Sequence, residues 1–140
     1  MIDLSLCAKW IYETLSGDAT ITGIMSTRIY RDAAPQGAIM PCIVFQLQSP
    51  GNDLNGVGGR RIYNASQWTV KAIAQGGEYS GNLNTLATRI DALLHDKHSA
   101  VGSDGQVWCV RLRPFQMPEI DNGIQYRHSG GVYEITAQVY

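Results

Sequence analysis

The sequence predicts a single α+β domain covering residues 1–140, with a mostly antiparallel sheet and two main helices packed on one of its faces. Two segments repeat apolar residues at helical spacing, and the other patterned segments alternate apolar and polar residues as strands do. One helix comes at the start and the other before the last strands, so most strands can pair directly with one another. With 140 residues, the chain can bury one continuous core.

The first helix is predicted by an apolar repeat near the N-terminus. Asp3 is expected to cap its start and Gly17 to end it. We expect a short second helical turn over residues 21–25 and a brief strand over residues 28–31. Two prolines and a glycine predict a loop at residues 33–41. The apolar repeat of the first helix consists of Leu4, Cys7, Ala8, Ile11 and Leu15.

Two strands are predicted in the middle of the chain, because residues 42–48 and 60–75 alternate in polarity. In the first strand Ile43, Phe45 and Leu47 share one face. The second strand is long, and we expect one of its faces to be buried and the other to face water. Its expected buried face carries Trp68, Val70, Ala72 and Ala74, and its expected wet face carries Gln67, Thr69 and Lys71.

The second half of the chain predicts one more helix and two more strands. Residues 83–94 form the clearest amphipathic helix. Glycines predict a turn at residues 102–105, and alternation predicts strands at residues 107–113 and 126–140. The shared faces are Leu83, Leu86, Ala87, Ile90, Leu93 and Leu94 in the helix and Tyr133, Ile135, Ala137 and Val139 in the last strand.

Two long loops are predicted between these strands. Residues 50–59 contain four glycines, two asparagines and a proline, which indicate a mobile hairpin or an assembly loop. Residues 114–123 begin with proline and end with glycine, and they are expected to form a second polar loop. A domain with two such loops and no convergent chemistry suits the binding of other proteins.

The charge balance gives no sign of a nucleic-acid-binding surface. Eleven basic and twelve acidic residues leave a formal net charge of −1. Cys7, Cys42 and Cys109 are widely spaced among apolar neighbours, which predicts reduced core thiols in a cytosolic protein. The N-terminus lacks the pattern of a signal peptide and no stretch is apolar enough to span a bilayer, so we expect a soluble protein without a membrane partner.

No residues are spaced like a catalytic or metal site. His95 and His98, with Asp96 between them, could ligate a metal, but such residues at a helix end more often interact with its last carbonyl groups. His128 has no acid placed to orient it, so no catalytic triad is indicated. The sequence therefore predicts no catalytic residue, no cofactor and no metal, and a protein that is not an enzyme.

Three other patterns have plainer interpretations. A strand, not a helix, is expected after residues 56–59, Arg60 and Arg61, so a phosphate-binding loop is not favoured. Glu119 and Asp121 could pair for acid–base chemistry, but a solvated loop is the better interpretation. Five tyrosines are expected at core edges or subunit contacts, because tyrosine joins apolar area to one polar tip. These are Tyr30, Tyr63, Tyr126, Tyr133 and Tyr140.

One segment resembles a known family. Residues 28–37 are Arg-Ile-Tyr-Arg-Asp-Ala-Ala-Pro-Gln-Gly, and Met40-Pro41 then leads into an apolar strand. This pattern resembles the small tail-completion or tail-terminator proteins of tailed bacteriophages, which join head and tail. The similarity continues in order through the strand at residues 67–70, the helix at residues 87–94 and a closing strand that ends in an aromatic residue.

The resemblance implies a structural protein of the virion that assembles in the bacterial host cytoplasm. Such proteins form a ring, usually a hexamer, which caps the head-proximal end of the tail tube, ends tube polymerisation and offers a surface to the neck. The implied partners are other copies of the chain, the major tail tube protein and a neck or head-completion protein. Genomic DNA would pass through the lumen without specific binding, and the near-neutral charge is consistent with this.

A closed ring needs a different surface on each side of the subunit, and long loops can supply them. We expect ring contacts on residues 33–40, 50–59 and 114–122. An alternative is that residues 28–37 only shape a turn. The candidate subunit or tail-tube contacts are Arg28, Asp32, Gln36, Asn52, Asp53, Asn55, Arg60, Glu119 and Asp121.

Two other functions stay open. A neck or head-closure connector protein would bind the portal-side complex rather than the tube. A small-ligand-binding or enzymatic α+β domain would need a deep pocket in which polar groups converge. The sequence disfavours this last function, because its histidines and acids are not grouped.

Overall fold

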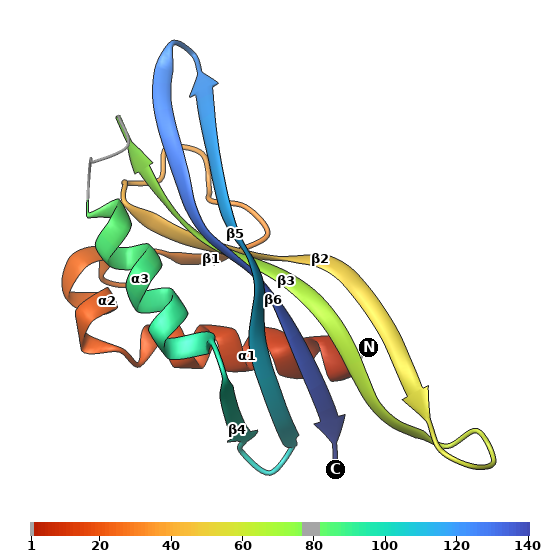
Figure 1. Cartoon of the computed structure of the whole chain (residues 1–140). Helices are drawn as coiled ribbons and strands as arrows, with labels where there is room; N and C mark the ends of the chain where they lie inside the picture. Colours follow the sequence, from red (N-terminus) through yellow and green to blue (C-terminus); the bar gives the residue numbers. More distant parts are fainter. Residues whose placement is uncertain (1, 77–81) are drawn as a thin grey trace.

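The computed structural model describes residues 2–76 and 82–140 and shows, in that part of the chain, an α+β fold with one six-stranded sheet (Figure 1). The strand order is β1-β2-β3-β6-β5-β4, and every neighbouring pair is antiparallel except β1 with β2. The predicted fold class is confirmed. The elements are α1 (Ile2–Ser16), α2 (Ala19–Met25), β1 (Ile29–Arg31), β2 (Cys42–Asn55), β3 (Arg61–Gln75), α3 (Leu83–Leu94), β4 (Lys97–Val101), β5 (Gly105–Asp121) and β6 (Ile124–Val139).

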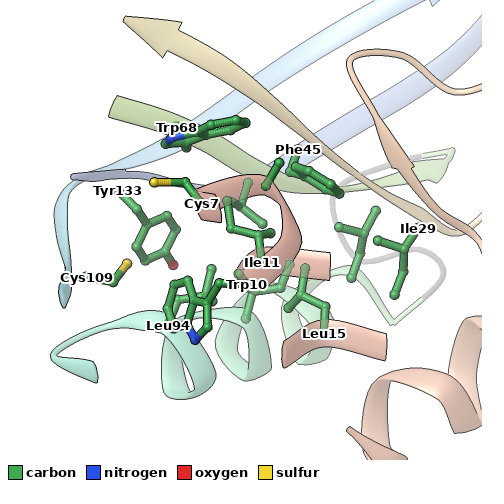
Figure 2. Close-up of a cluster of buried hydrophobic side chains, with 14 of the residues drawn as sticks. Cys7, Trp10, Ile11, Leu15, Ile29, Phe45, Trp68, Leu94, Cys109 and Tyr133 are labelled. Atoms are coloured by element: carbon green, nitrogen blue, oxygen red, sulfur yellow. The ribbon is translucent and has the colours of Figure 1, made fainter. Parts of the chain in front are cut away.

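The main core lies between the helices and one face of the sheet (Figure 1). Phe45, Trp68 and Tyr133 come from the sheet, and Ile11 and Leu94 come from α1 and α3 (Figure 2). Burying side chains of this size contributes roughly 1.5–3 kcal/mol each. The buried face predicted for the long strand is confirmed, since Trp68, Val70, Ala72 and Ala74 are all at most 1% exposed.

The first helix differs from the prediction at its start. α1 already includes Ile2, so Asp3 lies in its first turn and is not the residue that precedes the helix. The Asp3 carboxylate is buried and lies 3.4 Å from Arg61 Nη2 on β3. The side chain that caps a helix is that of Asp18, which accepts a hydrogen bond from the Ile21 N–H at the start of α2.

Residues 50–59 belong to a hairpin, one of the two predicted alternatives, whereas the loop predicted at residues 114–123 is wrong. β2 continues to Asn55 and β5 continues to Asp121, so residues 50–55 and 114–121 are strands. Among the described residues, β1 pairs with β2 only at residues 43–45, and β4 pairs with β5 only at residues 105–109. Prolines 50, 114 and 118 therefore lie on open strand edges, where a missing N–H removes no bond between strands.

The face of the sheet away from the helices is only partly exposed to solvent. Thr69 and Lys71 of β3 were predicted to face water, but they are 1% and 8% exposed. The loop before β2 covers this part of the sheet, and Ala34 and Met40 pack there on a second small apolar cluster. The cluster consists of Cys42, Val44 and Ile73.

The structure adds a strand that the sequence pattern did not predict. β4 follows α3 after Asp96, whose φ of 56° reverses the chain, and it pairs with the start of β5. His98 therefore lies on a strand rather than at the end of a helix. His95 is the residue at the end of α3, where its backbone N–H bonds to the Asp91 carbonyl.

The three cysteines are free and buried, as predicted. Burial raises the pKa of the Cys7 and Cys42 thiols to about 11, and burial raises the pKa of Cys109 as well. All three thiols are therefore protonated and unreactive in the folded protein. No helix of the described residues is long and apolar enough to cross a membrane.

Candidate assembly surfaces and a polar pocket

Two long hairpins extend from the body toward opposite ends of the molecule (Figure 1). The first, the β2–β3 arm, comprises residues 50–64, and the second, the β5–β6 arm, comprises residues 113–127. Most side chains on both arms are exposed, including large apolar ones. The exposed apolar side chains are Leu54, Val57 and Ile62 on the β2–β3 arm and Ile120 and Ile124 on the β5–β6 arm.

The β2–β3 arm has an ordered base. Asn64 Nδ2 donates hydrogen bonds to Asp53 Oδ1 at 3.0 Å and to the Pro50 carbonyl at 3.2 Å. The strand register shifts between Ser49 and Asn52, and Gly51 lies in this irregularity with φ +70°. A Cβ at Gly51 would lie 1.5 Å from the Ala65 carbonyl oxygen, so only glycine fits.

Four of the predicted contact residues lie on the β2–β3 arm. Asn52 and Asn55 are exposed on β2, and Arg60 is exposed at the tip. Asp53 holds the Asn64 amide and so contributes to the structure of the arm. The Gly56 N–H bonds to the Arg60 carbonyl and closes the tip.

The segment that carries the family resemblance, residues 28–37, comprises β1 and the first part of the loop that covers the face of the sheet away from the helices. Arg28 Nε donates a hydrogen bond to the Pro41 carbonyl at 3.0 Å, so this side chain fixes the two ends of the loop. The Asp32 N–H bonds to the Phe45 carbonyl, and its φ of 70° turns the chain away from β1. The Met40-Pro41 peptide bond is cis. The alternative that this segment shapes a turn therefore has direct structural support.

A pocket of about 360 Å³ lies between this loop, the sheet and the β5–β6 arm. The structure brings together four predicted contact residues here, because Asp32 and Gln36 on the loop and Glu119 and Asp121 on β5 all line the pocket. The expectation that Glu119 and Asp121 lie in a loop is wrong, since both are on a strand. These side chains are far apart in sequence and share one surface.

Lys71 and His128 form the floor of the pocket, and sequence reasoning missed both. They are 8% and 4% exposed. The Lys71 ammonium lies 5.2 Å from the centre of the Phe115 ring. His128 Nε2 lies 3.6 Å from Glu119 Oε1, which is too long for a hydrogen bond, and neither ring nitrogen has a hydrogen-bond partner in the structure.

Burial controls the ionisation of both groups. It lowers the pKa of Lys71, which the nearby Glu119 opposes. Burial also lowers the pKa of His128, and the positive charge of Lys71 lowers it further, while Glu119 raises it. The imidazole is therefore neutral near pH 7, with one N–H donor and one acceptor nitrogen.

One sequence signal could have revealed this pocket. Ile73 alternates with Thr69 and Lys71, so the face predicted to be wet also carries a large apolar side chain. Glu119 lies beside His128 in this pocket, with Asp32 and Asp121 on the same lining, so the expectation that the histidines and acids are not grouped is wrong here.

The other candidate residues have separate partners. His95 Nδ1 accepts a hydrogen bond from the Arg111 N–H at 3.0 Å, and the His98 ring stacks on Trp108 at 4.5 Å. Within residues 2–76 and 82–140, no three His, Cys, Asp or Glu side chains are grouped to hold a metal ion. Residues 56–59 form a hairpin tip, and β3 follows them.

Comparison with known proteins shows a shared fold. No protein-family model and no curated protein matches this chain. It is similar to a chain of the solved structure "Virion of native gene transfer agent (GTA) particle", with a TM-score of 0.61, 13% identity and coverage of 92% of this chain and 90% of that chain. A second solved structure, whose name states no function, has a TM-score of 0.65 at 13% identity and covers 98% of this chain and 96% of that chain. The likeness spans nearly all of each chain.

Proposed function

We propose that the chain is a structural protein of a phage-type virion. It forms a ring on the head-proximal end of the tail tube, ends tube polymerisation and offers a surface for head–tail joining. The observation that carries this proposal is the pair of arms that leave the body in opposite directions with exposed apolar side chains (Figure 1). The shared fold with a chain of a gene transfer agent virion supports the same class of function.

The arms make physical sense as assembly elements. Ordering a residue costs roughly 1–2 kcal/mol of backbone entropy, and the outer parts of these hairpins bury little apolar surface of their own. Burial against other subunits would offset that cost. Because the two arms differ in sequence and direction, a contact between one arm and a different surface of the next copy is head-to-tail, and such contacts form a ring when the rotation between copies closes.

The proposed partners are other copies of the chain, the major tail tube protein and a neck or head-completion protein. Binding between copies of the chain is tested first. No catalytic step is part of this function. Genomic DNA would pass through the ring without specific binding, as the formal net charge of −1 allows.

The first test is the solution mass of the purified protein by light scattering, over a range of concentration and salt. We expect a species several times heavier than the 15.4 kDa chain, and a hexamer-sized particle is the specific expectation. A double variant, Val57→Ser with Ile120→Ser, should shift this species toward the monomer, because it removes one exposed apolar side chain from each arm.

A monomer at every concentration would call for a second experiment. Tail tubes would then be added, because some rings could close only on the tube. Failure to bind tube ends, together with a monomeric state, would overturn the proposal and favour a neck connector instead.

A further inference from the structure

The polar pocket carries an excess of negative charge. Three carboxylates line it, from Asp32, Glu119 and Asp121, against the single ammonium of Lys71. With His128 neutral, two negative charges are in excess, on a chain whose formal net charge is only −1. An anion would be repelled by this rim. The electrostatics therefore favour a cationic occupant.

The floor of the pocket lacks hydrogen-bond partners that a buried group normally has. Both ring nitrogens of His128 are buried and have no hydrogen-bond partner, and leaving such groups unsatisfied destabilises the folded protein. The unprotonated nitrogen can accept from a donor that enters the pocket. Glu119, whose side chain is 47% exposed, can accept from the same donor. A guanidinium group offers several N–H donors in one plane and fits this arrangement.

The tip of the β2–β3 arm presents such a group. Arg60 is exposed and forms no ion pair with any acid of the described residues, whereas Arg61 already pairs with Asp3. Val57 at the same tip is fully exposed. Gly58 and Gly59 carry no side chains and have open space around them, so the tip is narrow.

We infer that the pocket receives the basic tip of the β2–β3 arm, residues 56–60, from a second copy of this chain. The tip lies at the far end of the sheet from the loop that covers the pocket, so it cannot fill the pocket of its own chain (Figure 1). The contact is head-to-tail and generates a ring or an open array. This inference rests on the proposed self-assembly and assigns the two surfaces that meet in it.

Charge reversal tests the pairing directly. Arg60→Glu and Asp121→Arg should each raise the dissociation constant for self-association by at least about tenfold, as measured by sedimentation velocity. The double variant should recover most of the lost affinity, because the two reversed charges attract again. Lys97→Glu is the matched control. It changes the net charge as much as Arg60→Glu does, from an exposed site on β4, and should leave the dissociation constant unchanged.

Site-specific cross-linking gives a second readout in the full-length protein. A photoreactive phenylalanine analogue at position 57 should cross-link to peptides that contain Asp32, Gln36 or Glu119 of another copy, identified by mass spectrometry of mixed isotope-labelled and unlabelled protein. The same labelled protein is also irradiated in the presence of tail tubes. Cross-links to other regions of a second copy, or to the tube protein alone, would overturn the inference.

The outcomes separate this inference from the proposed function. If the protein self-associates or caps tubes while the reversed pair fails to rescue binding, the pocket assignment is wrong and the ring proposal stands. If the protein neither self-associates nor binds tubes, both the ring proposal and the pocket assignment fail.

Discussion

Trp68 is the largest fully buried side chain among the described residues and belongs to the main core (Figure 2). It lies on β3, and its indole N–H donates a 2.9 Å hydrogen bond to Ser66 Oγ. Trp68→Ala should lower the free energy of unfolding by about 3–5 kcal/mol, because a large cavity remains and the hydrogen bond to Ser66 Oγ is lost. Urea denaturation measures this change. An unchanged midpoint would contradict the assignment of this face to the core.

Asp18 joins α2 to α3. Its carboxylate accepts from the Ile21 N–H at 3.1 Å and from Arg89 at 2.6 and 3.0 Å, and the Arg89 hydrogen bonds lower its pKa. Asp18→Ala removes the cap and the ion pair and should cost roughly 1–2 kcal/mol or more. Asp18→Asn keeps a capping acceptor and should cost less. Equal losses in thermal unfolding would show that the cap contributes little.

The same lowered pKa gives Asp18 a pH dependence with a defined sign. A carboxyl group whose folded-state pKa is depressed stabilises the fold above its unfolded pKa, about 3.9 for Asp. That stability is lost as the pH falls through the folded-state pKa. The difference in free energy of unfolding between the wild type and Asp18→Asn should therefore become smaller as the pH is lowered below about 4.

His128 should make the protein acid-sensitive in a higher pH range. Burial and Lys71 lower its folded-state pKa, so the unfolded chain binds a proton near pH 6.5 while the folded chain does not. Stability should fall as the pH drops below about 6.5 and level off below the folded-state pKa. His128→Gln should reduce this slope in urea titrations between pH 7 and 5, and His98→Gln, at an exposed position, should leave it in place.

At the scale of elements, the sequence predicted the body well and the arms poorly. The helical repeats of α1 and α3 and the alternation of β3 depend on local spacing, which the sequence displays directly. The arms contain Pro50, Pro114 and Pro118, which ordinarily interrupt strands. Whether a proline is tolerated depends on whether its strand has a second neighbour, and that is a property of the sheet order.

One strong local signal for the second arm was present in the sequence. Asn122-Gly123 is a typical two-residue hairpin turn, and both residues have positive φ, at 51° and 76°. Ile120 before it and Ile124 after it are the apolar flanks expected of such a hairpin. The Asn122-Gly123 turn is stronger evidence for the β5–β6 arm than Pro114 and Pro118 are evidence against it.

β6 passes the centre of the sheet at a point where only glycine fits. A Cβ at Gly130 would lie 2.1 Å from the Val70 carbonyl oxygen and 2.6 Å from Lys71 Cα. Gly130→Ala should therefore destabilise the fold by roughly 1–3 kcal/mol. Gly23→Ala is the matched control, since its Cβ meets open space within α2, and it should stabilise the fold by about 0.5–1 kcal/mol. Calorimetry of both variants checks the pair, and equal effects would contradict the close approach of β6 and β3.

At the scale of the whole molecule, the set of side chains in the pocket depends on how the folded sheet brings separate segments together. Asp32, Lys71, Glu119 and His128 come from four segments, and β6 brings the last two together through the hairpin pairing of Glu119 with Tyr126. The Asn122-Gly123 turn sets the pairing within that hairpin, but no sequence spacing brings Asp32 and Lys71 beside it. The fold divides most of the candidate contact residues between one arm and one pocket.

The molecule as a whole is a packed body with two projecting hairpins. The main core lies in the body, between the helices and one face of the sheet. The hairpins extend beyond that core and carry exposed apolar side chains. The assembly proposal explains why these hairpins are long and why they extend in opposite directions (Figure 1).

The most direct test of that proposal is electron microscopy of growing tail tubes with and without the purified chain. The account predicts extra density at one end of each tube and arrested growth at that end, with both effects lost in the Val57→Ser, Ile120→Ser double variant. Tubes that keep growing at both ends, with no added density, would contradict it.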